Sequence, residues 1–175
     1  PPVGASDPIP WEGPVAEAFA LPFGKGTGEG YHVFRKAFDE LPGETWDGVG
    51  GGDTDLGNPV STIGDGLVIF SGDSESKWGN MVIVRHAYRD ERGEIVLIDS
   101  IYAYLFEVFV RTGDEVSLGD PIGAIGRAKK EGNTALLYFA FRKCVDHSTQ
   151  NIESEQYRRY YHDPREFIAM FTSAE

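Results

Sequence analysis

The sequence has little of three features that would assign it to common classes of protein. It has a single cysteine, Cys144, so a disulfide within the chain is excluded and the redox compartment is left open. No apolar run approaches the roughly 18 residues of a membrane span. Lys and Arg total 16 against 28 Asp and Glu, and a formal net charge of −12 argues against binding to a nucleic-acid backbone or an anionic membrane.

Long leucine- and alanine-rich helical stretches are also missing, whereas glycine is abundant at 22 residues and aromatic residues make up 13% of the chain. This balance favours sheets that are joined by tight turns. A chain of 175 residues fits one domain that is long enough to bury a core without metals or disulfides.

Apolar segments that alternate with turn signals follow one another from residue 66 onward. They lie at residues 66–70, 80–87, 94–105, 115–126 and 134–142. The connection YRDERGE is short and polar enough to form a hairpin. Strands at this spacing without helices between them predict an all-β fold, an antiparallel β-sandwich or open barrel. Residues 31–38 are compatible with either a short helix or an extended segment.

The last part of the chain carries the signals that begin a helix. Asp163 suits the N-cap, Pro164 the first helical position and Glu166 the third, and the apolar residues FIAMF follow. The sequence therefore predicts a short C-terminal helix that packs its apolar face on the sheet.

Residues 46–60 form a glycine-dense segment, WDGVGGGDTDLGNPV. A phosphate-binding P-loop would need Gly-Lys-Ser/Thr at the start of a helix, which this segment lacks. The spacing Asp53-x-Asp55-x-Gly57 matches a fragment of a calcium loop but lacks its later Glu. We therefore expect a loop beside the sheet, in which glycines satisfy conformational demands.

Taken in order, several segments resemble the lysostaphin-like (LytM-type) zinc metallopeptidases, which cut peptide cross-links in peptidoglycan. The segments are GETWDGVGGGDTDLGNPV, GLVIFSG, WGNMVIVRHA, YAYL, VRTGDEVSLGDPIGAIG, LLYFAFR and DPREFI. The resemblance covers the chain from about residue 19 to its end. It implies the LytM (duplicated hybrid motif) fold, with residues 1–30 as a lead-in packed on a single domain of residues 31–175.

The resemblance also implies where zinc chemistry would lie. Active members bind zinc with a His and an Asp of an H-x-x-x-D motif and with the last His of an H-x-H motif, and these positions fall on Leu41, Thr45 and Tyr138. Two further catalytic His residues fall on Leu136 and Tyr104. None of the five family residues is present, so we expect that zinc and catalysis are lost and that the chain is a degenerate member.

Other residues offer weaker candidates for a site. Cys144, Asp146 and His147 are close in sequence, but three nearby ligands without a fourth are more often incidental. An aromatic-walled groove that holds a sugar or peptide is one interpretation of the replacements, with Trp46, His86, Tyr104 and Tyr138 as candidate binding residues. Filling of a former metal cavity by core side chains is the other interpretation.

The sequence thus favours a catalytically inactive homologue that acts as a binding or regulatory module of the bacterial cell envelope. The expected partner is peptidoglycan or an envelope protein such as a cell-wall hydrolase. The expected location is periplasmic or extracellular, after removal of a signal peptide that is not in this numbering. Two alternatives stay open: an active metalloendopeptidase whose unusual ligand set includes His86, and a biotinyl or lipoyl carrier domain modified at Lys129.

Overall fold

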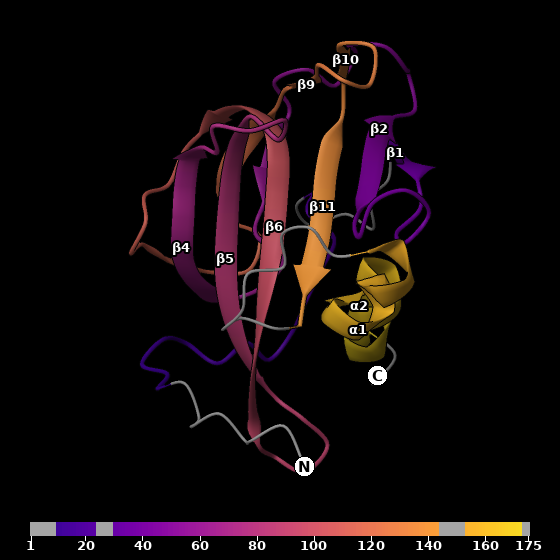
Figure 1. The fold of residues 1–175 in the computed structure, drawn as a ribbon. Coiled ribbons are helices and arrows are strands. Elements are labelled where there is room, and N and C mark those ends of the chain that lie inside the picture. The colour runs from indigo at the N-terminus through magenta and orange to yellow at the C-terminus, as the bar shows by residue number, and fades with distance from the viewer. Residues whose placement is uncertain (1–9, 24–29, 144–152, 173–175) are drawn as a thin grey trace.

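The structure, a computed structural model, describes residues 10–23, 30–143 and 153–172. Almost all of the regular structure is antiparallel β-sheet, and two short helices lie near the C-terminus beside the sheet (Figure 1). Among the described residues, no helix is both long and apolar enough to cross a membrane. The predicted fold class, antiparallel all-β with a short C-terminal helix, is confirmed.

One sheet contains ten of the strands and forms the body of the molecule. Its main path runs β1-β2-β11-β6-β5-β4-β7, while β12 pairs with β11, and β8 pairs with β3 and β6. The strands β9 and β10 form a separate pair. The strands are β1 (Tyr31–Arg35), β2 (Glu44–Gly48), β3 (Pro59–Ser61), β4 (Gly66–Asp73), β5 (Asn80–Arg89), β6 (Ile95–Val108), β7 (Glu115–Val116), β8 (Pro121–Ile125), β9 (Arg127–Ala128), β10 (Thr134–Ala135), β11 (Leu137–Arg142) and β12 (Tyr161–His162).

The longest strands form where the apolar alternation is strongest. β5 and β6 pair from Asn80↔Leu105 to Arg89↔Ile95, so YRDERGE does close a hairpin. Residues 31–38 contain an extended strand, β1, and no helix. Two strands, β2 and β3, lie within or beside the segment that was expected to be a loop. The predicted strand 134–142 is divided at Leu136, because this residue bonds to Gly126 of a neighbouring segment.

The C-terminal helix begins where its capping residues predict. Asp163 Oδ1 accepts hydrogen bonds from the amides of Arg165 and Glu166, and α2 (Pro164–Thr172) follows. Its residues Phe167 and Ile168 are buried in the core, so its apolar face packs on the sheet as expected. The 3-10 turn η1 (Ser154–Gln156) and helix α1 (Tyr157–Tyr160) precede it.

The sheet separates two groups of buried side chains. On one side lies the main core, which includes Phe19, Trp46, Tyr102, Phe139 and Phe141. On the other side lies the groove cluster, which consists of Ile101, Ala103, Tyr104, Ala128, Leu136, Tyr138, Ala140 and Tyr161. Adjacent residues of β11 alternate between the two groups, as the period of a strand requires.

Part of the N-terminal segment closes the main core. Ala16 donates its amide to Ala87 O at 2.7 Å, and Ala20 donates its amide to Ile63 O at 2.9 Å. Between them Phe19 is buried, and its ring makes edge contacts with the rings of His86 and Phe167. Residues 10–23 are thereby fixed to the body of the sheet.

Candidate binding groove

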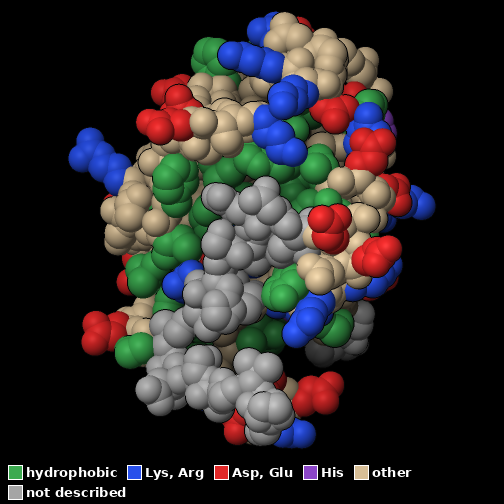
Figure 2. Space-filling view, in the orientation of Figure 1, with side chains coloured by type: hydrophobic (Ala, Val, Ile, Leu, Met, Phe, Trp, Pro, Cys, Tyr) green, Lys and Arg blue, Asp and Glu red, His purple; other side chains and the backbone are tan. Residues whose placement is uncertain are grey.

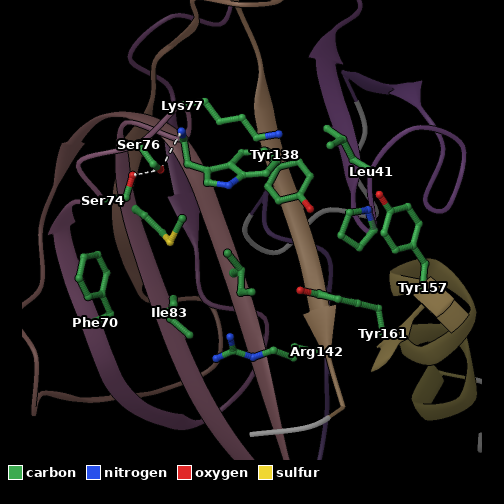
Figure 3. Close-up of a pocket in the computed structure, with 14 residues that line it drawn as sticks. Leu41, Phe70, Ser74, Ser76, Lys77, Ile83, Tyr138, Arg142, Tyr157 and Tyr161 are labelled. Atoms are coloured by element: carbon green, nitrogen blue, oxygen red, sulfur yellow. Dashed lines mark hydrogen bonds between the residues drawn. The ribbon is translucent and has the colours of Figure 1, made fainter. Parts of the chain in front are cut away.

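A groove crosses the face of the sheet that carries the groove cluster. It encloses about 800 Å³, and strands β4, β5, β6 and β11 form its floor (Figure 3). The connection between β4 and β5 forms one wall, and Leu41 and Pro42 with the α1–β12 segment form the other. Its lining consists of Leu41, Pro42, Phe70, Ser74, Ser76, Lys77, Trp78, Met81, Ile83, Ile101, Tyr138, Arg142, Tyr157 and Tyr161.

The five positions that carry the chemistry of active LytM-type enzymes converge beside this groove. Tyr138 of β11 pairs with Thr45 of β2 on one side and with Ala103 of β6 on the other. Tyr104, Leu136 and Tyr138 belong to the groove cluster, and Leu41 packs against it. The fold therefore brings these replacements to one place.

Tyr138 occupies the centre of this region and is only 3% exposed. Its hydroxyl accepts a hydrogen bond from the Gly43 amide at 3.1 Å. The Trp78 ring stacks on the Tyr138 ring, with centroids 4.2 Å apart and planes inclined by 30°. Burial raises the pKa of the Tyr138 phenol well above its ordinary value, so the group is a neutral hydroxyl at physiological pH.

Tyr104 departs from ordinary strand geometry. Its φ of +62° lies in the left-handed region, which costs a residue with a side chain about 1–2 kcal/mol. This twist places Tyr104 on the same side of the sheet as its neighbour Ala103. The Tyr104 amide donates to Trp78 O at 2.9 Å, and the two rings lie 5.6 Å apart. Tyr104 thus holds the loop that brings Trp78 over Tyr138.

The remaining positions provide no acid, base or ionisable ligand. Thr45 is buried, and its hydroxyl oxygen has no hydrogen-bond partner among the described residues. Leu136 is fully buried at the break between β10 and β11. Leu41 lies at the rim and contributes apolar surface to the wall.

Comparison with known proteins agrees with this geometry. The sequence model of peptidase family M23 matches residues 47–153, which is more than half of the 175 residues. The chain belongs to peptidase family M23. The match begins after Leu41 and Thr45, so the segment that would carry the first two zinc ligands lies outside it. A comparison with curated proteins found no match.

Solved structures share the fold of this M23 chain. A chain of the SpoIIQ–SpoIIIAH pore-forming complex superposes with a TM-score of 0.63 at 18% identity, covering 90% of this chain and 98% of that one. Lysostaphin from Staphylococcus simulans gives 0.55 at 19% identity, covering 91% and 52%. The protein cbpa from L. salivarius REN gives 0.55 at 17% identity, covering 91% and 99%. The chain thus spans about half of lysostaphin, and at these identities the likeness establishes the fold.

The residues at the M23 zinc positions do not fit the metal. Zinc takes imidazole, carboxylate or thiolate ligands, usually three from the protein in a catalytic site. Leu41 has no lone pair, Thr45 offers a neutral hydroxyl, and the Tyr138 hydroxyl is held by Gly43 beneath the Trp78 ring. Within residues 10–23, 30–143 and 153–172, no group of three or more His, Cys, Asp or Glu is placed to hold a metal ion.

Two of the four predicted groove residues lie elsewhere. Trp46 and His86 point into the main-core side of the sheet, where Trp46 contacts Phe23 and His86 contacts Phe19 and Phe141. The prediction that Trp46 and His86 border the groove is wrong. Successive residues of a strand face opposite sides of the sheet, and both of these residues fall on the core side. Tyr104 and Tyr138 do lie at the groove, and a binding role for them stays a prediction.

His86 is part of a buried polar chain instead. Its Nδ1 lies 2.8 Å from Asp65 O and its Nε2 lies 2.7 Å from Ser100 Oγ. Since a carbonyl oxygen only accepts, Nδ1 carries the proton and Nε2 accepts from the Ser100 hydroxyl. The Tyr102 hydroxyl lies 2.9 Å from Ser100 Oγ and accepts from the Ile63 amide. All of this is buried, so the His–Ser pair has no access to a substrate.

Three residues that shape the groove, Lys77, Trp78 and Arg142, were not predicted from the sequence. Trp78 lies above Tyr138, and Lys77 Nζ lies 4.7 Å from the Trp78 ring. Arg142 donates to Asp99 at 2.6 Å. Arg142 lies an even number of residues after Tyr138 on β11, so the alternation of a strand could have placed it on the same groove face.

The other candidates of the sequence analysis lie away from the groove or outside the described residues. Asp53 pairs with Arg127 at 2.7 Å and accepts from the Ala135 amide. Asp55 accepts from the Gly48 amide, so these carboxylates bind segments of the chain to one another. Lys129 is exposed on the connection between β9 and β10. Cys144, Asp146 and His147 lie outside the described residues.

The buried His86 predicts a loss of stability in acid. Burial lowers the pKa of His86 to about 4 from its ordinary value of 6.5, so the unfolded chain binds this proton more readily. Stability is therefore fully present above about pH 6.5 and falls by up to roughly 3 kcal/mol as the pH approaches 4. Urea unfolding across this pH range measures the loss.

The variant His86→Gln should flatten this pH dependence. His162, whose pKa is also lowered to about 4 by burial, acts in the same direction, so part of the slope should persist. Replacement of the exposed His32 by Gln controls for the substitution itself. An unchanged slope in His86→Gln would contradict this account of the polar chain.

Removing the Tyr138 hydroxyl should destabilise the fold. In Tyr138→Phe the buried Gly43 amide loses its acceptor, and an unsatisfied buried amide costs about 1–3 kcal/mol. Tyr157→Phe is the matched control, because that hydroxyl makes a longer, exposed bond of 3.3 Å to Glu40 O. Equal free energies of unfolding for the wild type and Tyr138→Phe would show that the bond contributes nothing.

Proposed function

We propose that this chain is a catalytically inactive member of peptidase family M23 that serves as a binding or regulatory module of the bacterial cell envelope. Its partner is peptidoglycan or an envelope protein such as a cell-wall hydrolase, and its location is periplasmic or extracellular. The observation that carries the proposal is Tyr138, a buried neutral phenol at a zinc-ligand position, bonded to Gly43 and covered by Trp78.

The chemistry of peptide hydrolysis supports inactivity. Zinc makes water a nucleophile near neutral pH by lowering its pKa to about 7, and this requires a metal on the protein. The ligand positions hold Leu41, Thr45 and Tyr138, and the base positions hold Tyr104 and Leu136. The alternative of a non-standard ligand set around His86 lacks support, because His86 faces the main core with both ring nitrogens in hydrogen bonds.

The shape of the groove supports a binding role. A cavity of about 800 Å³ remains although the metal position is filled, and this volume lies within the range of ligand pockets. In the part of this face that Figure 2 shows in colour, hydrophobic side chains gather above and to the left of the centre, and charged side chains lie mostly towards the edges. A protein of the same fold occurs in the SpoIIQ–SpoIIIAH pore-forming complex, which supports a role in an assembly by analogy of fold.

Incubation with purified peptidoglycan and with cross-linked peptides tests this function. We expect no chelator-sensitive cleavage, measured as release of free amines, because the protein generates no nucleophilic water. We expect co-sedimentation with peptidoglycan or a change in the rate of an added envelope amidase. An active M23 peptidase is the control for substrate quality. Chelator-sensitive cleavage would refute inactivity, and absence of both binding and amidase effects would refute the binding role.

A further inference from the structure

The charge of the groove differs from that of the whole chain. The chain carries a formal charge of −12, whereas the described groove lining contains Lys77 and Arg142 and no Asp or Glu. Figure 3 shows Lys77 at the upper end of the groove and Arg142 at the lower end. Two cations thus flank an apolar floor on a protein that is otherwise acidic.

Arg142 is fixed in place by Asp99, the buried carboxylate of its cross-strand neighbour on β6. Asp99 is fully buried and accepts from Arg142 at 2.6 Å and from Arg85 at 2.9 Å. One carboxylate shared by two guanidiniums neutralises Arg142 only in part. Arg142 Nε is buried and has no hydrogen-bond partner among the described residues. The buried Nε does not reach a ligand, and it is the exposed 16% of the Arg142 side chain that presents positive charge at the groove surface.

Lys77 lies in the connection between β4 and β5, which forms one wall of the groove, and is exposed. Its ammonium group rests 4.7 Å from the Trp78 ring, which orients it beside the groove without neutralising its charge. Between the two cations the floor is formed by Phe70, Met81, Ile83 and Ile101.

We propose that the groove binds a peptide segment of a partner protein in which apolar side chains are flanked by Asp or Glu. The apolar side chains lie on the floor formed by Met81, Ile83 and Ile101, and the carboxylates reach Lys77 and Arg142. This inference rests on the proposed binding function and specifies its partner as an acidic, apolar segment of protein.

The lining favours such a segment over a glycan. Burying sugar hydroxyls requires hydrogen-bond partners, and the floor residues between the cations have apolar side chains. The hydroxyls of Ser74 and Ser76 are 2.8 Å apart and bonded to each other. The face of Tyr138, which could have stacked on a sugar, is covered by Trp78. Apolar side chains and carboxylates match the apolar floor and the two cations at its ends.

The test uses two labelled hexapeptides with leucine and phenylalanine at the centre, one flanked by aspartate and glutamate and the other by lysines. The net charge of −12 by itself would favour the lysine peptide, so a preference for the acidic peptide must come from the groove. We expect the acidic peptide to bind about tenfold more tightly at physiological salt. Fluorescence anisotropy measures affinity, and the Trp78 indole NMR signal reports the position of binding.

Single substitutions identify the charged residues that contribute to binding of the acidic peptide. Lys77→Glu should weaken binding of the acidic peptide roughly fivefold, and Arg142→Gln should weaken it about tenfold, with folding checked by thermal denaturation. Lys129→Glu is the matched control, because Lys129 is exposed and lies outside the groove lining. It should leave the affinity unchanged. An equal effect of Lys129→Glu and Lys77→Glu would overturn the proposal.

Two further outcomes separate this inference from the proposed function. Equal or tighter binding of the lysine peptide would refute the inference. Binding of purified peptidoglycan fragments that shifts the Trp78 signal, with no binding of either peptide, would also refute it while leaving the proposed binding function intact. Chelator-sensitive hydrolysis would refute the proposed function itself.

Discussion

The pleat of strands β2, β11 and β6 is the constraint on which the rest of the site depends. Alternate residues face opposite sides of a sheet, so Thr45 and Tyr138 face the groove whereas Trp46 and Phe139 face the main core. The same strands therefore build the core and carry three of the five former catalytic positions, Thr45, Tyr104 and Tyr138, while Leu41 and Leu136 lie just before β2 and β11. Tyr104 is the exception, since its left-handed backbone places it beside Ala103 on the groove side.

Replacement of the metal-binding residues changes how this region is held together. A zinc site would join its strands through ligands, whereas here a ring stack between Trp78 and Tyr138 and a hydrogen bond from Gly43 join them. Buried aromatic surface is stabilising, and such ring pairs add about 0.5–1.5 kcal/mol beyond burial. Within the part of the chain that the structure describes, the Thr45 hydroxyl has no hydrogen-bond partner, so the replacement leaves one buried polar group unpaired there. Beside the filled position the groove remains, with cations at both ends.

Signals from residues close together in the sequence predicted those parts of the fold that depend on such neighbours. The hairpin of β5 and β6 follows from alternation and a polar turn, and α2 begins where Asp163 caps it. His86 was wrongly predicted to border the groove, although its shared strand parity with Val82 and Val84 of the main core would have placed it on the core side. The Trp78 stack and the break at Leu136 depend on contacts between segments distant in sequence, which periodicity does not encode. The five replaced positions were found from the resemblance to the LytM-type enzymes.

Calorimetric titration of zinc into chelator-treated protein tests the central claim most directly. The account predicts no one-to-one event tighter than about micromolar, since Leu41, Thr45 and Tyr138 supply no suitable ligand set. The triple variant Leu41→His, Thr45→Asp, Tyr138→His is the control, because it returns the family's ligand types to those positions. Tight stoichiometric binding by the unmodified chain would contradict the account and would indicate a zinc site built from other residues.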